Sequence, residues 1–267
     1  MQKIGFIGGG NMAAAIMGGI IGSGARAPSD VIVSDVNAAS LKALGEKFGV
    51  GIARGNCEVA REAGLIVLAV KPQFYREVIE EIRADVLADG QKIVLTLPPG
   101  WTLARVEQAF SGPLKIVRTM PNTPALVGEG LTAACPNELV TDDEMERVLA
   151  LLGSFGRAQI LPERLFDVFA ALCGSSPAFV FMVIEAMCDA AVREGMPRAQ
   201  AYTLAAQAVL GSAKMVLELG QHPGALKDMV CSPGGSTIEG VRALEAGGMR
   251  TAFFEAIARS VAKNREI

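Results

Sequence analysis

The sequence is poor in the side chains from which many catalytic centres are built. Its 267 residues include one histidine, His222, and five cysteines that form no Cys-x-x-Cys pair. A zinc site needs clustered His, Cys or carboxylate ligands, and a serine triad needs a histidine beside its nucleophile. We therefore expect neither a metal centre nor a triad. Widely spaced cysteines, odd in number, are typical of a reducing compartment and predict a cytoplasmic protein.

Clusters of positive charge are also missing. Lys and Arg total 25 against 28 Asp and Glu, which gives a formal net charge of −3, and the sequence contains no basic block. Proteins that bind nucleic acid neutralise its phosphates with concentrated Lys and Arg, so we expect no nucleic-acid partner. Hydrophobic residues make up 51% of the chain and charged residues 20%, which excludes intrinsic disorder and predicts a sizeable core.

The first part of the chain alternates short apolar runs with amphipathic segments such as 38–48 and 103–110. The runs are continuously apolar rather than alternating, which is typical of parallel strands covered by helices on both faces. They span Lys3–Ile7, Val31–Ser34, Leu65–Val70, Ile93–Thr96 and Lys115–Arg118. Residues 1–160 are therefore predicted to form a doubly wound, Rossmann-like α/β domain.

From residue 161 to residue 267 the pattern changes to an all-helical domain. Predicted helices cover Glu163–Leu172, Pro177–Glu194, Pro197–Leu219, Pro223–Met229, Ser236–Ala246 and Arg250–Lys263, with proline at their starts and Gly195 and Gly220 at their ends. The segment Phe179–Ile184 is apolar around the whole helix circumference. A helical domain of this size cannot bury such a segment alone, so we expect a homo-oligomer formed through it.

A glycine fingerprint follows the first predicted strand. Gly8-x-Gly10-x-x-Ala13 matches the dinucleotide-binding turn, in which small residues let the backbone and the next helix approach a pyrophosphate. The alternative is a turn with packing roles only. The fingerprint lies within a charge-free stretch, Ile4–Ala25, that is long enough to cross a bilayer. Because eight of its 22 residues are glycine, we interpret it as strand, turn and packed helix, and expect no membrane partner.

The second predicted strand ends in Ser34-Asp35. An acidic residue at this place accepts hydrogen bonds from ribose hydroxyls and repels a 2′-phosphate, which favours NAD. Ser34 could instead bond a phosphate, and Asp35 or Asn37 could simply cap the following helix. In the loop Ala69-Val70-Lys71-Pro72, at a strand's carboxyl end, Lys71 is either a charge near the cofactor or a solvated lysine.

A hydroxyl-rich turn precedes a predicted helix in the second domain. Cys231-Ser232-Pro233-Gly234-Gly235-Ser236-Thr237 brings free amides and hydroxyls together where a small carboxylate can bind. An ordinary capped helix start is the alternative. Gly174-Ser175-Ser176-Pro177 is a similar turn into a helix.

Together these segments resemble the pyrroline-5-carboxylate reductase family, whose members catalyse the last step of proline synthesis. The resemblance covers nearly the whole chain, is strongest to bacterial members, and is carried by residues 8–13, 69–72, 120–125, 174–178 and, above all, 222–238. It implies a helical domain interlaced with that of a second subunit and a small-molecule substrate. In the implied reaction, NADPH or NADH reduces 1-pyrroline-5-carboxylate to L-proline.

The family pattern also implies site residues. Cofactor contacts fall on Gly8, Gly9, Gly10, Asn11, Met12, Ser34, Asn56, Ala69, Val70, Lys71 and Pro72. Substrate contacts fall on Ser232, Gly234, Gly235, Ser236 and Thr237, with the catalytic hydroxyl of Thr237 at the imine nitrogen. The resemblance implies NADPH, whereas Asp35 departs from the neutral residue often found there and leaves NADH open. A second departure is Leu97-Pro98-Pro99-Gly100-Trp101, where small residues are usual.

The implied chemistry suits a chain with few titrating groups. A protonated imine is already an electrophile, so orientation rather than acid–base power carries the rate. His222 begins a Pro-Gly turn, where we expect it to cap or orient. A β-hydroxyacid dehydrogenase is an alternative, but it requires a helix-borne Lys followed four residues later by Asn, and here Lys214 is followed by Glu218. A non-catalytic dinucleotide sensor is a third possibility, disfavoured by the intact 232–237 segment.

Overall fold

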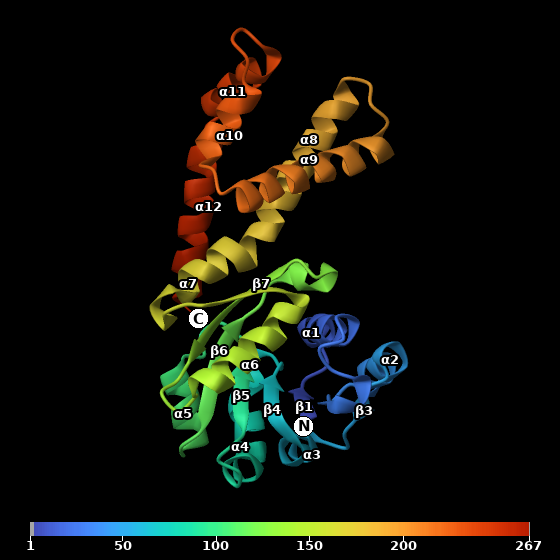
Figure 1. The fold of residues 1–267 in the computed structure, drawn as a ribbon, viewed down its shortest axis with the longest axis vertical. Helices are drawn as coiled ribbons and strands as arrows, with labels where there is room; N and C mark the ends of the chain where they lie inside the picture. Colours follow the sequence, from blue (N-terminus) through green and yellow to red (C-terminus); the bar gives the residue numbers. More distant parts are fainter. Residues whose placement is uncertain (1–2, 267) are drawn as a thin grey trace. The chain divides into compact units, whose positions relative to one another are not determined.

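The structure is a computed structural model that describes residues 3–266. The chain divides into two compact units (Figure 1). The first holds the residues up to Gly174 together with the last segment from Val261, and the second spans Ser175–Ser260.

The first unit is built on one eight-stranded sheet with the order β3-β2-β1-β4-β5-β6-β7-β8. All neighbouring strands are parallel except β6 and β7. The strands are β1 (Lys3–Ile7), β2 (Val31–Ser34), β3 (Gly51–Ile52), β4 (Ala63–Leu68), β5 (Ile93–Thr96), β6 (Lys115–Met120), β7 (Gly130–Pro136) and β8 (Gly156–Ile160). The predicted doubly wound α/β class is confirmed.

Sequence pattern located the buried strands and missed the marginal ones. The run Leu65–Val70 was placed two residues late, since β4 begins at Ala63 and ends at Leu68. Three strands were not predicted. β3 is only two residues long, and β8 is largely exposed, so neither forms an apolar run. β7 reads Gly-Leu-Thr-Ala-Ala-Cys-Pro, whose small and polar residues lack the β-branched signal.

Helices cover both faces of this sheet. They are α1 (Asn11–Gly22), α2 (Ala38–Phe48), α3 (Asn56–Glu62), α4 (Tyr75–Leu87), α5 (Leu103–Phe110), α6 (Asp142–Leu152) and the short α7 (Phe166–Phe169). Alternate residues of β1 divide between the two cores: Phe6 joins the cluster with α1, α2 and α6, and Ile7 joins the cluster with α3, α4 and α5. The strands β1, β2, β4, β5 and β6 are therefore buried on both faces, as continuous apolar runs predict.

The strand order reverses beside β1, which lies between β2 and β4. Connections from β1 and from β4 lead to opposite sides of the sheet, and this leaves a crevice beyond the carboxyl ends of the two strands. The fold therefore directs the search for a ligand to the segments after Ile7, Ser34 and Leu68.

The second unit is entirely helical. It contains α8 (Ser176–Arg193), α9 (Arg198–Leu219), α10 (Pro223–Val230), α11 (Ser236–Ala246) and most of α12 (Met249–Asn264). Gly195 and Gly220 have positive φ angles of 97° and 61°, which suits the helix ends predicted there. The prediction of a turn at 174–177 is wrong, because a π-helical segment, Ala170–Ser175, continues directly into α8.

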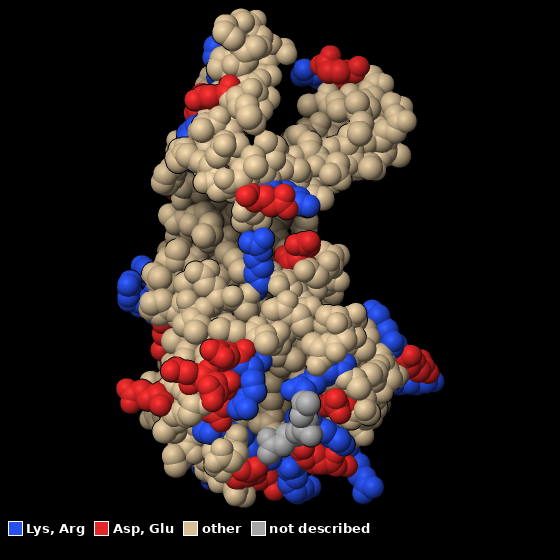
Figure 2. All heavy atoms as spheres, viewed as in Figure 1, with Lys and Arg blue, Asp and Glu red and all other residues tan. Residues whose placement is uncertain are grey.

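Large apolar side chains are exposed along the helical unit. Phe181 and Met182 are 62% and 67% exposed, and Phe254 is 79% exposed. Figure 2 shows many charged side chains over the sheet-bearing unit and fewer over the helices. Among the described residues, one helical stretch, Glu163–Arg193, is long and apolar enough to cross a membrane by length and composition alone, and 17% of its most apolar window is buried.

The packing of α1 on the chain before β8 yields a stability prediction. A Cβ added at Gly19 would overlap Cβ of Phe155 and lie 3.1 Å from its Cα, whereas one added at Gly22 meets nothing within 4 Å. We expect Gly19→Ala to lower the free energy of unfolding by about 1–3 kcal/mol. Gly22→Ala, the matched control in the same helix, leaves it unchanged or raises it by up to about 1 kcal/mol. Urea unfolding at one protein concentration measures both, and equal midpoints for the two variants would contradict the packing argument.

Candidate functional site

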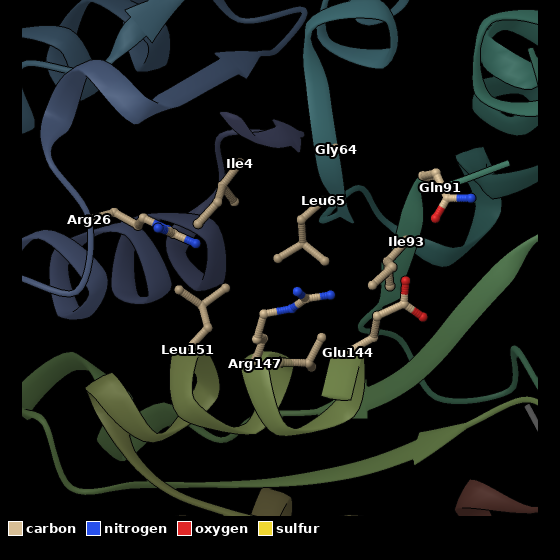
Figure 3. Close-up of a pocket in the computed structure, with 10 residues that line it drawn as sticks. Ile4, Arg26, Gly64, Leu65, Gln91, Ile93, Glu144, Arg147 and Leu151 are labelled. Carbon is tan, nitrogen blue, oxygen red and sulfur yellow. The ribbon is translucent and has the colours of Figure 1, made fainter. Parts of the chain in front are cut away.

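Two cavities of similar size lie at opposite edges of the sheet. One, of about 270 Å³, is lined at the amino ends of the strands by Ile4, Leu65 and Ile93, with Arg147 reaching in from α6 (Figure 3). The other, of about 250 Å³, lies at the carboxyl ends and is lined by Gly8, Asp35, Val36, Asn56, Val70, Phe74, Glu77, Val78 and Glu81. In doubly wound sheets ligands bind at the carboxyl ends, so the second cavity is the candidate site.

The glycine turn forms one wall of this cavity. Gly8 has a φ of +102°, and a Cβ there would lie 2.7 Å from the carbonyl carbon of Ala69, so only glycine fits between the two strand ends. A Cβ on Gly10 would meet nothing within 4 Å, and no side chain caps α1 at this residue. The first amides of α1 therefore face open space where a phosphate can bind.

A chain of polar side chains crosses the floor of the cavity. The hydroxyl of Ser34 donates to Oδ1 of Asn56 at 2.8 Å, and Nδ2 of Asn56 donates to Oε2 of Glu81 at 2.7 Å. Ser34 is 2% exposed and is not among the residues that line the cavity. Its hydroxyl orients the Asn56 amide, which does line the cavity, and direct contact of Ser34 with a cofactor stays a prediction.

Asp35 sits directly beside the glycine turn. Its Oδ2 accepts a hydrogen bond from the N–H of Gly9, and its Oδ1 accepts one from the N–H of Asn37 at 2.7 Å. The helix cap of α2 is a different residue, because Oδ1 of Asn37 accepts from the N–H groups of Ala39 and Ser40. Of the two cap alternatives, the one for Asn37 is therefore confirmed and the one for Asp35 is wrong.

The loop Ala69–Pro72 is supported from below by two aromatic residues. Tyr75 donates to the carbonyl oxygen of Leu68 and accepts from the N–H of Leu97 at 3.2 Å. Burial raises the pKa of Tyr75 above its usual range, so its hydroxyl stays protonated as a structural donor. Trp101 packs on Tyr75 with ring centroids 4.9 Å apart and donates to the carbonyl oxygen of Pro72 at 3.3 Å.

These contacts explain the departure at residues 97–101. Trp101 is 4% exposed and fills the space beneath the loop, so the larger residues there hold the loop rather than block the cavity. Lys71 is exposed on the same loop. Sequence pattern missed Tyr75, Glu77 and Glu81, because all three lie on α4 beyond the Lys-Pro motif. For Glu77 and Glu81 the sequence did contain a signal. The two glutamates are four residues apart, which places them on one face of a helix that begins shortly after the motif.

The hydroxyl-rich turn lies wholly within the second unit. Gly234 has a φ of +68°, and the N–H of Gly235 donates to the carbonyl oxygen of Ser232 at 3.0 Å, which closes the turn. No side chain caps α11, so its first amides and the exposed hydroxyls of Ser236 and Thr237 are available together. The ordinary start with a side-chain cap is therefore excluded, and the binding of a carboxylate at this turn stays a prediction.

His222 has a structural role in the described chain. Its Nδ1 accepts a hydrogen bond from the N–H of Gly224 at 3.0 Å and caps α10, as its place before Pro-Gly predicts. Within residues 3–266, no group of three or more His, Cys, Asp or Glu side chains is arranged to hold a metal ion. Lys214 pairs with Glu218 at 3.5 Å on the exposed face of α9. That ordinary surface pair counts against the dehydrogenase pattern.

Comparison with known proteins covers the whole chain. Residues 163–267 match a family model described as pyrroline-5-carboxylate reductase dimerisation, and residues 3–98 match one described as NADP oxidoreductase, coenzyme F420-dependent. The chain is 49% identical to the pyrroline-5-carboxylate reductase of Escherichia coli, over 100% of this chain and 98% of that protein.

Solved structures agree with the sequence comparison. The pyrroline-5-carboxylate reductase of Coxiella burnetii superposes with a TM-score of 0.92 at 36% identity and covers 99% of this chain and 98% of its own. The pyrroline carboxylate reductase of Plasmodium falciparum, solved with NADP bound, has a TM-score of 0.89 at 29% identity, over 99% and 97% of the two chains.

The glycine turn, the polar residues after β2 and the helical carboxyl-terminal region define a dinucleotide-dependent oxidoreductase of the Rossmann class. Full-length identity narrows this class further. The chain belongs to the pyrroline-5-carboxylate reductase family.

The open space over Gly10 gives a binding prediction. The φ of Gly10 is −76°, which alanine adopts freely, so Gly10→Ala leaves the unfolding midpoint unchanged. The added methyl group occupies the approach of the pyrophosphate to α1, and we expect dinucleotide affinity to fall by about tenfold or more. Gly90→Ala, another site where a Cβ meets nothing within 4 Å, is the control and leaves affinity unchanged. Calorimetric titration measures both; undiminished affinity in Gly10→Ala would place the pyrophosphate elsewhere.

Proposed function

We propose that this protein reduces 1-pyrroline-5-carboxylate to L-proline with NAD(P)H, the last step of proline synthesis. Full-length membership of the family supports the reaction. The observation in this chain that carries it is the uncapped start of α11, where free amides follow a turn closed by Ser232 and Gly235. Such a helix start binds the carboxylate of a small substrate.

Residues of the first unit fit a dinucleotide. We assign the pyrophosphate to the turn of Gly8, Gly9, Gly10, Asn11 and Met12, and further contacts to Asn56, held by Ser34, and to Ala69, Val70, Lys71 and Pro72. The space over Gly10 and the uncapped first amides of α1 support this assignment. When bound, the reduced dinucleotide supplies the hydride that the imine carbon accepts.

Residues of the second unit then have to hold and orient the other reactant. We assign the substrate carboxylate to the amides and hydroxyls of Ser232, Gly234, Gly235 and Ser236, and the ring nitrogen to the hydroxyl of Thr237. The nitrogen carries its proton into the reaction, so the imine is electrophilic before reduction and the product is a secondary amine. The Thr237 hydroxyl holds the N–H of the ring in a fixed direction, and the positioning of the two reactants provides most of the rate enhancement.

In this proposal the boundary between the two functional domains lies near residue 160. Residues 1–160 bind the dinucleotide, and residues 161–267 bind the substrate and form the subunit interface. The dimerisation model that begins at residue 163 supports this boundary, while the change of compact unit after Gly174 lies 14 residues beyond residue 160. All five cysteines are free thiols, which supports a cytoplasmic location.

One assay tests the reaction and the role of Thr237 together. The purified protein is given 1-pyrroline-5-carboxylate with NADPH and, in parallel, with NADH, and cofactor oxidation is followed. We expect turnover with at least one cofactor, and Thr237→Ala to lower kcat by about 10²-fold with dinucleotide affinity unchanged. Thr237→Ser keeps the hydroxyl and retains most of the activity. No turnover with either cofactor would refute the function; loss of dinucleotide binding in Thr237→Ala would refute the site.

The helical unit supports a homodimer or larger oligomer. A cavity of about 270 Å³ between α8 and α12 is lined entirely by apolar or small residues, Phe179, Met182, Val183, Ala186, Ala252, Phe253 and Ala256. Apolar grooves of this kind are covered in stable assemblies, and the dimerisation model spans the same helices. A second copy of this chain is the proposed occupant.

Sedimentation at micromolar concentration tests the oligomer. We expect the wild-type protein to sediment as a dimer or larger, and Met182→Glu to shift it toward monomer because a charge is buried without a partner. Lys42→Glu, at a 77% exposed position on α2, is the control and leaves the assembly intact. A stable wild-type monomer, or partition of the protein into lipid vesicles, would contradict the proposed interface.

A further inference from the structure

The candidate cofactor cavity carries an unusual concentration of negative charge. Asp35, Glu77 and Glu81 are among the nine described residues that line it, and none of those nine is Lys or Arg. The two glutamates come from α4 and Asp35 from the end of β2, so the charge reaches the cavity from separate elements.

The hydrogen bonds of Asp35 determine which ligand groups its carboxylate can bind. Each of its carboxylate oxygens already takes one backbone N–H, from Gly9 and from Asn37, so the group is held in place beside the glycine turn. An ionised carboxylate has no proton to donate, but each oxygen accepts more than one hydrogen bond. Ribose hydroxyls, which donate, fit such a group. A 2′-phosphate, which at neutral pH brings only acceptors and negative charge, does not.

The neighbouring polar residues do not offset this charge. The hydroxyl of Ser34 donates to Asn56, and one N–H of the Asn56 amide donates to the carboxylate of Glu81, which adds a negative charge beside it. Val36, directly after Asp35, is fully exposed at the cavity and offers the dinucleotide an apolar surface without charge. The two side chains that line the cavity directly after β2, Asp35 and Val36, therefore offer a 2′-phosphate no hydrogen-bond donor.

From these contacts we infer that the protein binds NADH in preference to NADPH, and that Asp35 is the residue that sets the preference. The inference deepens the proposed function, on which it rests for the identity of the site. Glu77 and Glu81 add to the repulsion of a 2′-phosphate. Because the effect is electrostatic, the preference narrows as ionic strength rises.

Equilibrium binding without any pyrroline substrate is the test. Dissociation constants for NADH and NADPH, from nicotinamide fluorescence, are measured for the wild type, Asp35→Asn and Asp35→Ser. We expect the wild type to bind NADH at least about tenfold more tightly, and both variants to reduce that ratio by about tenfold or more, chiefly by strengthening NADPH binding. The unfolding midpoint of each variant is measured alongside, so that a general loss of structure is recognised.

Two further variants make the test specific. Asp30→Asn removes a carboxylate at the opposite end of β2 and leaves the ratio unchanged. Arg54, two residues after β3, represents the alternative of a cationic partner for a 2′-phosphate; its backbone N–H donates to Glu58, and Arg54→Gln leaves the ratio unchanged. Loss of NADPH affinity in Arg54→Gln would overturn the inference, because it would identify a phosphate site.

The outcomes separate this inference from the proposed reaction. Equal or tighter binding of NADPH by the wild type would overturn the preference, and equal weakening of both cofactors in Asp35→Asn would reduce Asp35 to a structural role. Either result leaves the reductase assay untouched. Conversely, a protein that prefers NADH but does not turn over 1-pyrroline-5-carboxylate would retain the preference and lose the proposed reaction.

Discussion

The close approach of three strand ends around Gly8 is the constraint on which the rest of the site depends. The N–H of Gly8 donates to the carbonyl of Ser34 at 2.8 Å, and the N–H of Ala69 donates to the carbonyl of Ile7 at 2.8 Å. These bonds continue the sheet ladder one residue beyond the strands, and they leave no room for a side chain on Gly8. The turn is thereby forced outward, and the uncapped start of α1 faces the space to which we assign the pyrophosphate.

That turn depends on packing beneath it, which explains the two large buried aromatic residues, Tyr75 and Trp101, that lie beside the cavity without lining it. Tyr75 joins the end of β4 to the segment after β5 through one hydroxyl, and Trp101 holds the carbonyl of Pro72. Arg105 stacks over the Trp101 ring at 4.6 Å from its centroid and shields it from solvent. Residues that look like departures from a motif can in this way preserve the loop that the motif requires.

Sequence reasoning succeeded where a single local pattern determines the outcome. β1, β2 and β5 were predicted with their observed bounds because two-sided burial demands an unbroken apolar run, and α2 and α5 followed from periodicity and capping. It failed where the outcome depends on tertiary neighbours. β7 pairs antiparallel with β6 using small residues, and the continuity of the helix through Ala170–Ser175 overrides the turn signal of Gly174 and Ser175. In the site, the glycine turn was readable from spacing. The burial of Ser34 was not readable, and the spacing of Glu77 and Glu81 did not by itself place them at the site, because both features depend on which helix packs against the end of β2.

The sequence has few charged residues, and the physical reason differs between the two units. In the first unit, apolar residues fill the strands of a sheet that helices cover on both faces. In the second, from Ser175 to Ser260, the buried apolar residues are Cys188, Ala201, Ala205 and Leu226, while long side chains such as Phe181 and Phe254 remain exposed. Apolar area left in water contributes nothing to folding, so any surface that covers these side chains adds to the stability of this unit. In the proposed oligomer, association through the helices and the stability of the turn at 232–237 are linked, because whatever binds only the folded helices also stabilises them by mass action.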